Sequence, residues 1–443
     1  MDRIVEISRI IWGWPLITAL SGCGVFLSLK LKFPQIFRLK TAIKYIMSEK
    51  EEENLIGDVS NFASLCTALS ATVGTGNIVG VALAIAAGGP GVLFWIWVSA
   101  FFGMAVKYAE GMLAVKYRQI GSDKKIAGGP MYYIEKGLNS KFLAKMFALT
   151  GIMVALIGIG TLTQSNSIAA AIGESFGISK FVNAILLGIV VAVVTIGGIH
   201  KISYVSEKII PLACLSYVGA AIVALIINIE LLPNAIYLIF MGAFSPQSIF
   251  GGGVGITAMT AMQLGISRGI FSHESGLGSA AIAAAAAKTN SPEKQGLISM
   301  TGTFFSIIVC TMTGLVLIIT SKETGIFTSE CIMDGALLTS YAFEAGIEIP
   351  GIGKHIVNFG ILFFAFTTII GWNYYGEKCV QYLWGTKAIN QYRVLFLFFV
   401  VIGPFFKIDM IFAIADIVTG LMAIPNLYSL IALRKAIQRP PEA

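Results

Sequence analysis

A Gly-Thr-Gly peptide, Gly74 to Gly76, lies in the middle of an apolar run from Phe62 to Ala87. Each glycine weakens the interior of a helix by about 1 kcal/mol relative to alanine. In hydrocarbon, a backbone group released from a helix costs several kcal/mol unless another group satisfies it. A break is tolerable there if the released amides and carbonyls meet a solute or an ion. The peptide therefore predicts a binding site inside a membrane.

The composition places the whole chain in a membrane. Of its 443 residues, 56% are hydrophobic and 12% are charged, whereas a soluble domain has about 25% charged residues. Apolar stretches of about 20 residues recur along the chain, which is typical of an all-α, polytopic membrane protein. The net charge of +7 does not indicate nucleic acid, because the basic residues gather in short loops.

The sequence contains none of the usual catalytic or metal-ligating patterns. Its six cysteines include no CxxC pair and no His/Cys ligand set, so neither disulfides nor a bound metal cofactor is expected. No Ser/His/Asp arrangement or phosphate loop is visible either. These observations argue against an enzyme.

We expect eleven transmembrane helices in a single domain covering residues 1–443. The expected spans are 10–30, 60–88, 91–115, 146–172, 180–198, 205–228, 253–287, 295–320, 355–383, 391–406 and 408–433. The segment 234–248 is too short to span and is expected at the interface. With the amino terminus outside, the inner segments hold 23 of the 31 Lys and Arg residues and the outer segments hold 6. This asymmetry predicts an outer amino terminus and an inner carboxyl terminus.

A second span, 253–287, is also interrupted, since glycines and charged residues fill its stretch from Gly265 to Ser279. If 10–30 is set aside as an extra helix, the two interrupted spans are the first and the sixth of ten. Five helices separate their starts, so the repeats 60–228 and 253–433 have inverted topology. Discontinuous helices at matching positions indicate a transporter site near the midplane of the membrane.

Several motifs together resemble the alanine or glycine:cation symporter family over nearly the whole chain. They are Gly74 to Gly80, Gly88 to Gly91, Lys107 to Gly111, Gly128 to Tyr133 and Phe271 to Gly278. That family looks like a branch of the amino acid–polyamine–organocation superfamily, which implies a leucine-transporter fold of five plus five inverted helices. The resemblance implies sodium-coupled uptake of alanine or glycine, with sodium as the coupling ion. We expect a multi-pass protein of a prokaryotic plasma membrane that works as a monomer.

A zwitterionic amino acid needs donors for its carboxylate and acceptors for its ammonium group. The amides of Thr75 and Gly76 fit the first role, since helix amino termini bind anions. Unwound carbonyls from Gly269 to Ser272 fit the second. The predicted substrate site also includes Ile270 and Gly276. The alternative is that Gly-x-Gly is a close-packing contact between helices.

Three large side chains complete the predicted substrate site. Gln164 lies in a polar band within the span 146–172, where an amide is costly unless it faces protein or a cavity. We expect it to contact substrate; an interhelical hydrogen bond is the alternative. Phe271 and Trp372 are expected to close and size the pocket, with ordinary packing as the alternative.

The resemblance also implies sodium ligands. One ion would bind the carbonyls of Ser70, Val73 and Phe364 with the hydroxyls of Thr367 and Thr368. The alternative is that these hydroxyls bond the preceding turn of their own helix. A weaker set for a second ion consists of Thr72, Asn77, Ser272 and the substrate carboxylate.

Ionisable residues inside the spans leave a competing mechanism open. Lys107 and Glu110 are three residues apart on one helix and are expected to form an ion pair, with Asp416 as another partner for Lys107. Arg268, His273 and Glu274 are expected to form a gate network, or Arg268 to contact the substrate carboxylate. Proton coupling through Glu110, Glu274 or Asp416 is the main alternative to sodium. A channel or an intramembrane enzyme fits the sequence less well.

Overall fold

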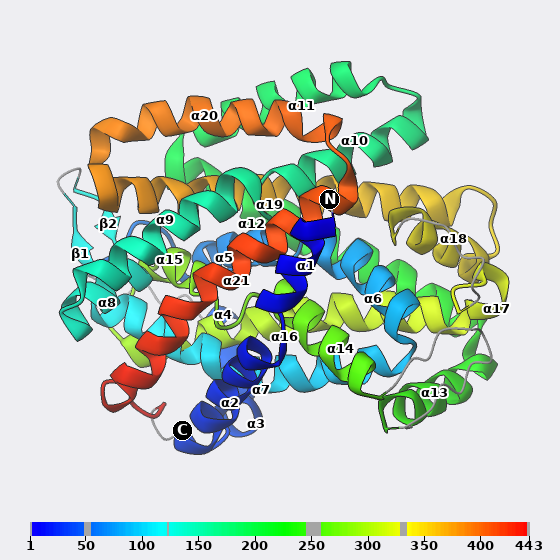
Figure 1. The fold of residues 1–443 in the computed structure, drawn as a ribbon, viewed down its shortest axis with the longest axis horizontal. Coiled ribbons are helices and arrows are strands. Elements are labelled where there is room, and N and C mark those ends of the chain that lie inside the picture. Colours follow the sequence, from blue (N-terminus) through cyan, green and yellow to red (C-terminus); the bar gives the residue numbers. More distant parts are fainter. Residues whose placement is uncertain (1, 48–54, 122–123, 245–257, 328–334, 441–443) are drawn as a thin grey trace.

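The computed structural model describes residues 2–47, 55–121, 124–244, 258–327 and 335–440. It is a bundle of helices in which two discontinuous helices occupy the centre (Figure 1). The helices up to residue 176 are α1 (Asp2–Ile11), α2 (Trp14–Lys30), α3 (Pro34–Phe37), α4 (Leu39–Met47), α5 (Asn61–Thr72), the π-helical η1 (Gly76–Gly80), α6 (Val81–Gly88), α7 (Gly91–Lys116), α8 (Pro130–Leu138), α9 (Lys141–Ile157) and α10 (Leu162–Phe176). The strands β1 (Gln119–Ile120) and β2 (Ile126–Ala127) pair antiparallel between α7 and α8.

The remaining helices follow the same order as the predicted spans. They are α11 (Lys180–Thr195), α12 (Gly198–Ile227), η2 (Ile229–Leu231), α13 (Leu232–Phe244), α14 (Ala258–His273), α15 (Ser279–Ala285), α16 (Pro292–Ile319), α17 (Ser321–Thr324), α18 (Gly335–Ile347), α19 (Ile352–Trp384), η3 (Thr386–Ala388), α20 (Ile389–Ile402), η4 (Gly403–Phe405), α21 (Ile408–Ala432) and η5 (Leu433–Lys435). Short polar side chains start several of them. The Ser60 hydroxyl accepts the Ala63 amide at 3.0 Å at the start of α5, and Ser291 caps α16 ahead of a proline in its first turn. Such caps satisfy amides that have no partner inside the helix.

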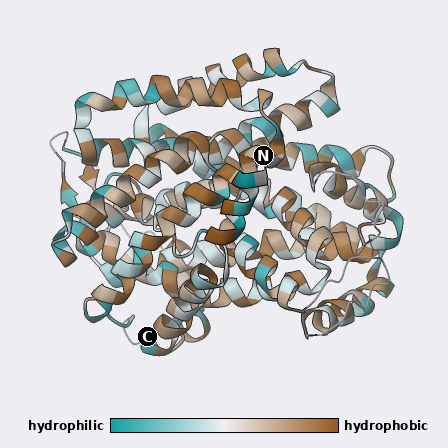
Figure 2. Ribbon diagram, in the orientation of Figure 1, coloured by the Kyte–Doolittle hydropathy of each residue, from teal (hydrophilic) through white to brown (hydrophobic). Residues whose placement is uncertain are grey.

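The outer helices present apolar side chains to their surroundings, as a membrane requires. Figure 2 shows long hydrophobic stretches on them, α11 and α20 among them. On α11, Phe181, Leu186 and Ile189 are all more than half exposed. Within the described residues, eight helices are long and apolar enough to cross a membrane, or nine if α5 and α6 count as one bent span. The two other expected spans correspond to α11, with 16 residues, and to the interrupted pair α14 and α15.

Some expected spans differ in detail from the observed helices. The span predicted at 146–172 consists of α9 and α10, which are separated at Gly158 to Thr161. The segment predicted at the interface forms α13, and its last residues, 245–248, lie outside the described residues, as do residues 253–257 of the predicted span 253–287. The number of spans and their orientation stay predictions.

The two discontinuous helices run antiparallel through the centre of the bundle (Figure 1). The first half of one helix contacts the second half of the other, α5 with α15 and α6 with α14, and η1 contacts α14. The long helices α7 and α16 pack against this central pair. This arrangement brings two backbone breaks, 200 residues apart in sequence, into the same region.

Candidate functional site

The first break separates α5 from η1. The backbone leaves helical geometry at Val73, with φ −89° and ψ 91°, and the two halves meet at an angle of 52°. Asn77 holds the break from within, since its Oδ1 accepts the Gly74 amide at 3.1 Å. Its Nδ2 donates to Ser306 Oγ of α16 at 2.8 Å. The break is therefore fixed by neutral polar groups.

Gln164 of α10 reaches this break directly. Its Oε1 accepts the Thr75 amide at 3.3 Å, and its Nε2 donates to the Ile159 carbonyl at 2.9 Å. A Cβ added at Gly74 would lie 3.3 Å from Gln164 Oε1 and 2.7 Å from Thr368 Oγ1. Glycine is required here because the two polar side chains approach the backbone so closely.

The oxygens proposed for one sodium ion converge on Thr368. Its Oγ1 lies 2.9 Å from the Ser70 carbonyl oxygen, 2.9 Å from that of Phe364 and 3.5 Å from that of Val73. The hydroxyl of Thr367 donates to Phe364 on its own helix at 3.0 Å. All five residues are buried. Hard cations bind clusters of oxygen atoms, so the geometry is compatible with an ion that replaces the Thr368 hydrogen bonds.

The residues of the second ion set lie less close together. Asn77 and Ser272 are connected through Ser306, whose hydroxyl donates to the Ser272 carbonyl at 3.2 Å. The Ser272 hydroxyl belongs to a buried residue at the end of α14. In contrast, the Thr72 hydroxyl donates to Ala68 on its own helix at 3.1 Å.

The second break begins later than expected. The prediction of unwound backbone from Gly269 to Ser272 is wrong, because α14 continues to His273. The chain leaves the helix through left-handed residues, with φ 54° at Glu274, 93° at Gly276 and 79° at Gly278. Gly269 serves packing instead, since a Cβ there would lie 2.1 Å from Ser99 Oγ of α7. The carbonyls of the last turn of α14 face the break, as they do at any helix end.

The predicted substrate residues separate into two groups. Thr75, Gly76, Phe271, Ser272 and Gln164 lie around the first break: a Cβ at Gly76 would lie 2.9 Å from the Phe271 ring and 3.5 Å from Ser272 Oγ. The Thr75 hydroxyl is also buried and has no partner among the described residues. These groups form the part of the predicted site that the fold brings together.

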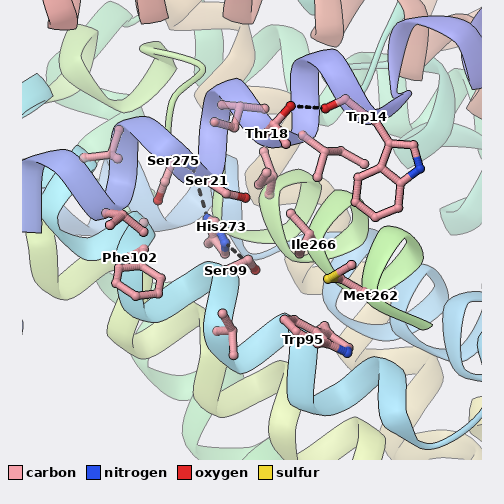
Figure 3. A pocket seen from close by; sticks show the side chains of 17 residues that line it. Trp14, Thr18, Ser21, Trp95, Ser99, Phe102, Met262, Ile266, His273 and Ser275 are labelled. Atoms are coloured by element: carbon pink, nitrogen blue, oxygen red, sulfur yellow. Dashed lines mark hydrogen bonds between the residues drawn. The ribbon is translucent and has the colours of Figure 1, made fainter. Parts of the chain in front are cut away.

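Trp372 and Gly276 lie at the second break instead. The Trp372 indole donates to Glu274 Oε1 at 3.2 Å, and the Gly276 amide donates to Glu110 Oε1 at 3.0 Å. Ile270 lines a separate cavity of about 380 Å³ between α2, α7 and α14, seen close by in Figure 3. Their roles toward substrate stay predictions.

The Glu110 carboxylate holds the second break. Besides the amide of Gly276, its Oε1 accepts the Gly278 amide at 3.0 Å and Asn426 Nδ2 of α21 at 2.7 Å. The expected ion pair with Lys107 is not formed: Lys107 Nζ is buried without a hydrogen-bond partner in the part of the chain that the structure describes. Glu110 turns instead toward backbone amides that sequence spacing does not reveal. Asn426 was missed, although a polar residue in an apolar span is a usable signal.

Arg268 forms an ion pair with Asp416, the residue that is also the alternative predicted partner for Lys107. Its two terminal nitrogens bond the two carboxylate oxygens of Asp416 in α21, each at 3.1 Å. Asp416 is therefore paired with Arg268, and the alternative pairing with Lys107 is wrong. The Arg268 guanidinium also lies 5.5 Å from the centre of the Phe271 ring. This ion pair covers the Phe271 side of the site.

His273 does not join that ion pair. Its Nδ1 accepts the Ser275 amide at 3.2 Å, and its Nε2 lies 3.2 Å from Ser99 Oγ, as Figure 3 shows. Both ring nitrogens are therefore engaged in fixing the second break to α7. Glu274, the third residue expected in the gate network, bonds Ser279 and Trp372. The described hydrogen bonds therefore do not join Arg268, His273 and Glu274, and a gate role stays a prediction.

Comparison with known proteins identifies the family. The family model described as the sodium:alanine symporter family matches residues 1–440. The chain belongs to the sodium:alanine symporter family. The resemblance seen in the sequence motifs is thereby confirmed.

Relatives of this family cover nearly the whole chain. An uncharacterized transporter of Haemophilus influenzae is 52% identical, over 97% of this chain and 93% of that protein. The sodium/alanine symporter AgcS of Methanococcus maripaludis is 45% identical, over 98% of this chain and 94% of that protein. The relatives are named transporters, so this protein is a multi-pass membrane transporter and not an enzyme.

Solved structures support the fold. MhsT in complex with L-phenylalanine superimposes with a TM-score of 0.59 at 13% identity, covering 86% of this chain and 90% of that one. A Na+-coupled sialic acid symporter gives 0.51 at 14% identity, covering 96% and 83%. The leucine-transporter type of fold, expected from the sequence, is confirmed.

Proposed function

We propose that the protein is a secondary active symporter that couples uptake of alanine and glycine to sodium by alternating access. The proposal rests on family membership and on AgcS, the 45%-identical relative named a sodium/alanine symporter. The observation that carries it is the buried group of neutral oxygens around Thr368. A cation can take these oxygens without any proton transfer, and residues 70–77 contain no carboxylate.

In this proposal the first break binds both solutes. Sodium takes the oxygens of Ser70, Val73, Phe364, Thr367 and Thr368. The substrate carboxylate takes the amides of Thr75 and Gly76. The Gln164 side chain leaves the Thr75 amide that its oxygen now contacts and donates from its Nε2 to the substrate carboxylate. Because ion and substrate order the same backbone, each raises the affinity for the other, and that mutual effect is the coupling.

The ring of Phe271 sets the size of the substrate. It lies against Gly76 and beneath Arg268, and we expect it to exclude substrate side chains larger than a methyl group. We assign the side with α1 to the outside and the carboxyl terminus to the inside of a prokaryotic plasma membrane.

The test is uptake of labelled alanine by proteoliposomes that hold the purified protein. An inward sodium gradient should drive accumulation, and replacing sodium with potassium should abolish it. Accumulation driven equally by a pH gradient without sodium would replace this proposal with proton coupling. Competition by unlabelled glycine, serine and leucine then tests the size limit.

A further inference from the structure

The amino-terminal helices α1 and α2 lie outside the ten-helix repeat. They contact it at α21 and at the second helix break. A Cβ at Gly420 of α21 would lie 2.3 Å from Ile11, so α1 crosses α21 in close contact. Farther along, Leu20 of α2 packs on the second break, 2.4 Å from a Cβ at Gly276. The extra helices therefore touch both the helix that carries Asp416 and the break itself.

Two side chains from this amino-terminal segment bond Asp416 directly. Trp12 Nε1 donates to the Asp416 backbone carbonyl at 2.9 Å. Ser8 Oγ donates to Asp416 Oδ2 at 3.3 Å, the same oxygen that Arg268 contacts at 3.1 Å. One carboxylate and its own backbone are thus held from the α1 side and from α14.

The ion pair of Arg268 with Asp416 depends on how the Asp416 carboxylate is oriented. A bidentate pair requires the guanidinium and the carboxylate to lie in one plane, so any rotation of the Asp416 side chain breaks one of its two bonds. Ser8 fixes the carboxylate and Trp12 fixes the helix beneath it. Both donors are more than nine-tenths buried, so water does not compete for the bonds.

The opposite end of the site is closed without help from α1 or α2. There the segment before α5 pairs with the segment after α15, with Asp58 and Lys288 amides bonding across. Arg118 donates to carbonyls on both segments, at 2.7 Å to Ala285 and 2.7 Å to Ile56. Only the Arg268 end, among the described contacts of these two closures, uses the extra amino-terminal segment.

We propose that the end of α1 and the turn after it, from Ser8 to Trp12, position Asp416 for its ion pair with Arg268 and thereby hold the outer gate of the transport site closed. Ser8 and Trp12 are positioning residues, since they act through Asp416 and touch neither substrate nor ion. The proposal rests on the proposed function for its meaning, because a gate matters only where a solute passes. The structural part of the proposal is that this amino-terminal segment supports the ion pair of Arg268 with Asp416, and it can be tested without measuring transport.

The experiment measures how fast phenylglyoxal modifies individual arginines in the purified full-length protein, resolved by mass spectrometry. Arg268 is compared with Arg393, whose pair with Glu377 has nearly the same exposure (22% and 8% against 25% and 11%). In Ser8→Ala/Trp12→Phe, Arg268 should react about tenfold faster, since a hydrogen bond to a charged group is worth about that factor. Arg393 should keep its wild-type rate.

Two matched variants sharpen the result. Trp14→Phe removes an indole two residues away that does not bond Asp416, and Ser8→Thr keeps the hydroxyl; both should leave Arg268 at the wild-type rate. An unchanged Arg268 rate in the double variant would overturn the proposal. So would a parallel rise for Arg268 and Arg393, which would indicate general loosening. Sodium-driven alanine uptake is measured on the same preparations, so its absence in the wild type refutes the proposed function separately.

Discussion

The two helix breaks differ in the chemistry that holds them open. At the first, neutral groups make the contacts: the Asn77 amide, the Gln164 amide and the Thr368 hydroxyl. At the second, one carboxylate, Glu110, accepts two backbone amides and a side-chain amide. Three donors from two segments of the chain therefore depend on one buried Glu110 oxygen, so the second break is the more firmly fixed.

The difference in chemistry indicates that the two breaks have different roles. Neutral hydroxyls and carbonyls can exchange their bonds for an ion or a zwitterion without leaving a charge unpaired. Release of Glu110 would leave three buried donors without an acceptor at once, which costs more. We therefore assign binding to the first break and mechanical anchoring to the second.

The largest effect is expected at Gly76. Gly76→Leu should abolish alanine binding while the protein remains folded, because even a Cβ there would lie 2.9 Å from the Phe271 ring. Equilibrium binding of labelled alanine in detergent measures this. Gly80→Ala, where an added Cβ meets nothing within 4 Å, should bind normally. Normal binding by Gly76→Leu would remove the first break from the substrate site.

Glu110 should matter for stability more than any neutral group at the first break. Glu110→Ala leaves two backbone amides and Asn426 without their acceptor. We expect a loss of about 3 kcal/mol in unfolding free energy, because each unsatisfied buried group costs about 1–3 kcal/mol. Equilibrium unfolding in mixed micelles provides the measurement. Glu344 also accepts two backbone amides, those of Gly351 and Lys354, but is only partly buried. Glu344→Ala should cost about 1 kcal/mol; equal losses in both variants would contradict the anchoring role.

Gln164→Leu should weaken alanine binding by about tenfold, which is the worth of one well-placed buried hydrogen bond. The substitution keeps the volume and removes the amide group that is proposed to move from the Thr75 amide to the substrate carboxylate. Gln35→Leu removes a buried amide that bonds Ser28, remote from both breaks in the sequence, and should bind alanine as the wild type does. A purely interhelical role predicts equal binding in the two variants and a lower melting temperature for Gln164→Leu.

The smallest effect is expected at Thr72. Its hydroxyl already bonds the carbonyls of its own helix, so Thr72→Val should change the sodium concentration for half-maximal alanine binding by less than about twofold. A sodium titration of alanine binding measures it. A large shift would mean that the hydroxyl turns to bind a second ion.

The sequence predicts those features of the fold and the site that depend on a local pattern of residues. Apolar length predicts helices, and Gly-Thr-Gly predicts the first break where the structure has it. The second break could not be located as well, because glycine serves two purposes. Gly269 allows α14 to pack on Ser99, while Gly276 and Gly278 supply left-handed backbone.

Partners distant in sequence could not be predicted from spacing. Lys107 and Glu110 are neighbours on one helix face, which favours a pair, but Glu110 bonds amides more than 160 residues away. Likewise Arg268 pairs with Asp416 across 148 residues. Such contacts depend on how helices pack in three dimensions, and one sequence does not encode that packing in any local pattern.

The most direct test of sodium binding at the first break is a sodium titration of alanine binding to Thr368→Ala and Thr367→Ala beside the wild type. Thr368 contacts three of the candidate ligand carbonyls, whereas Thr367 contacts Phe364 alone. Thr368→Ala should raise the sodium concentration for half-maximal binding by about tenfold, the effect of losing one ligand worth about 1.4 kcal/mol, and Thr367→Ala should raise it less. An unchanged sodium requirement in Thr368→Ala would contradict the assignment and place the coupling ion elsewhere.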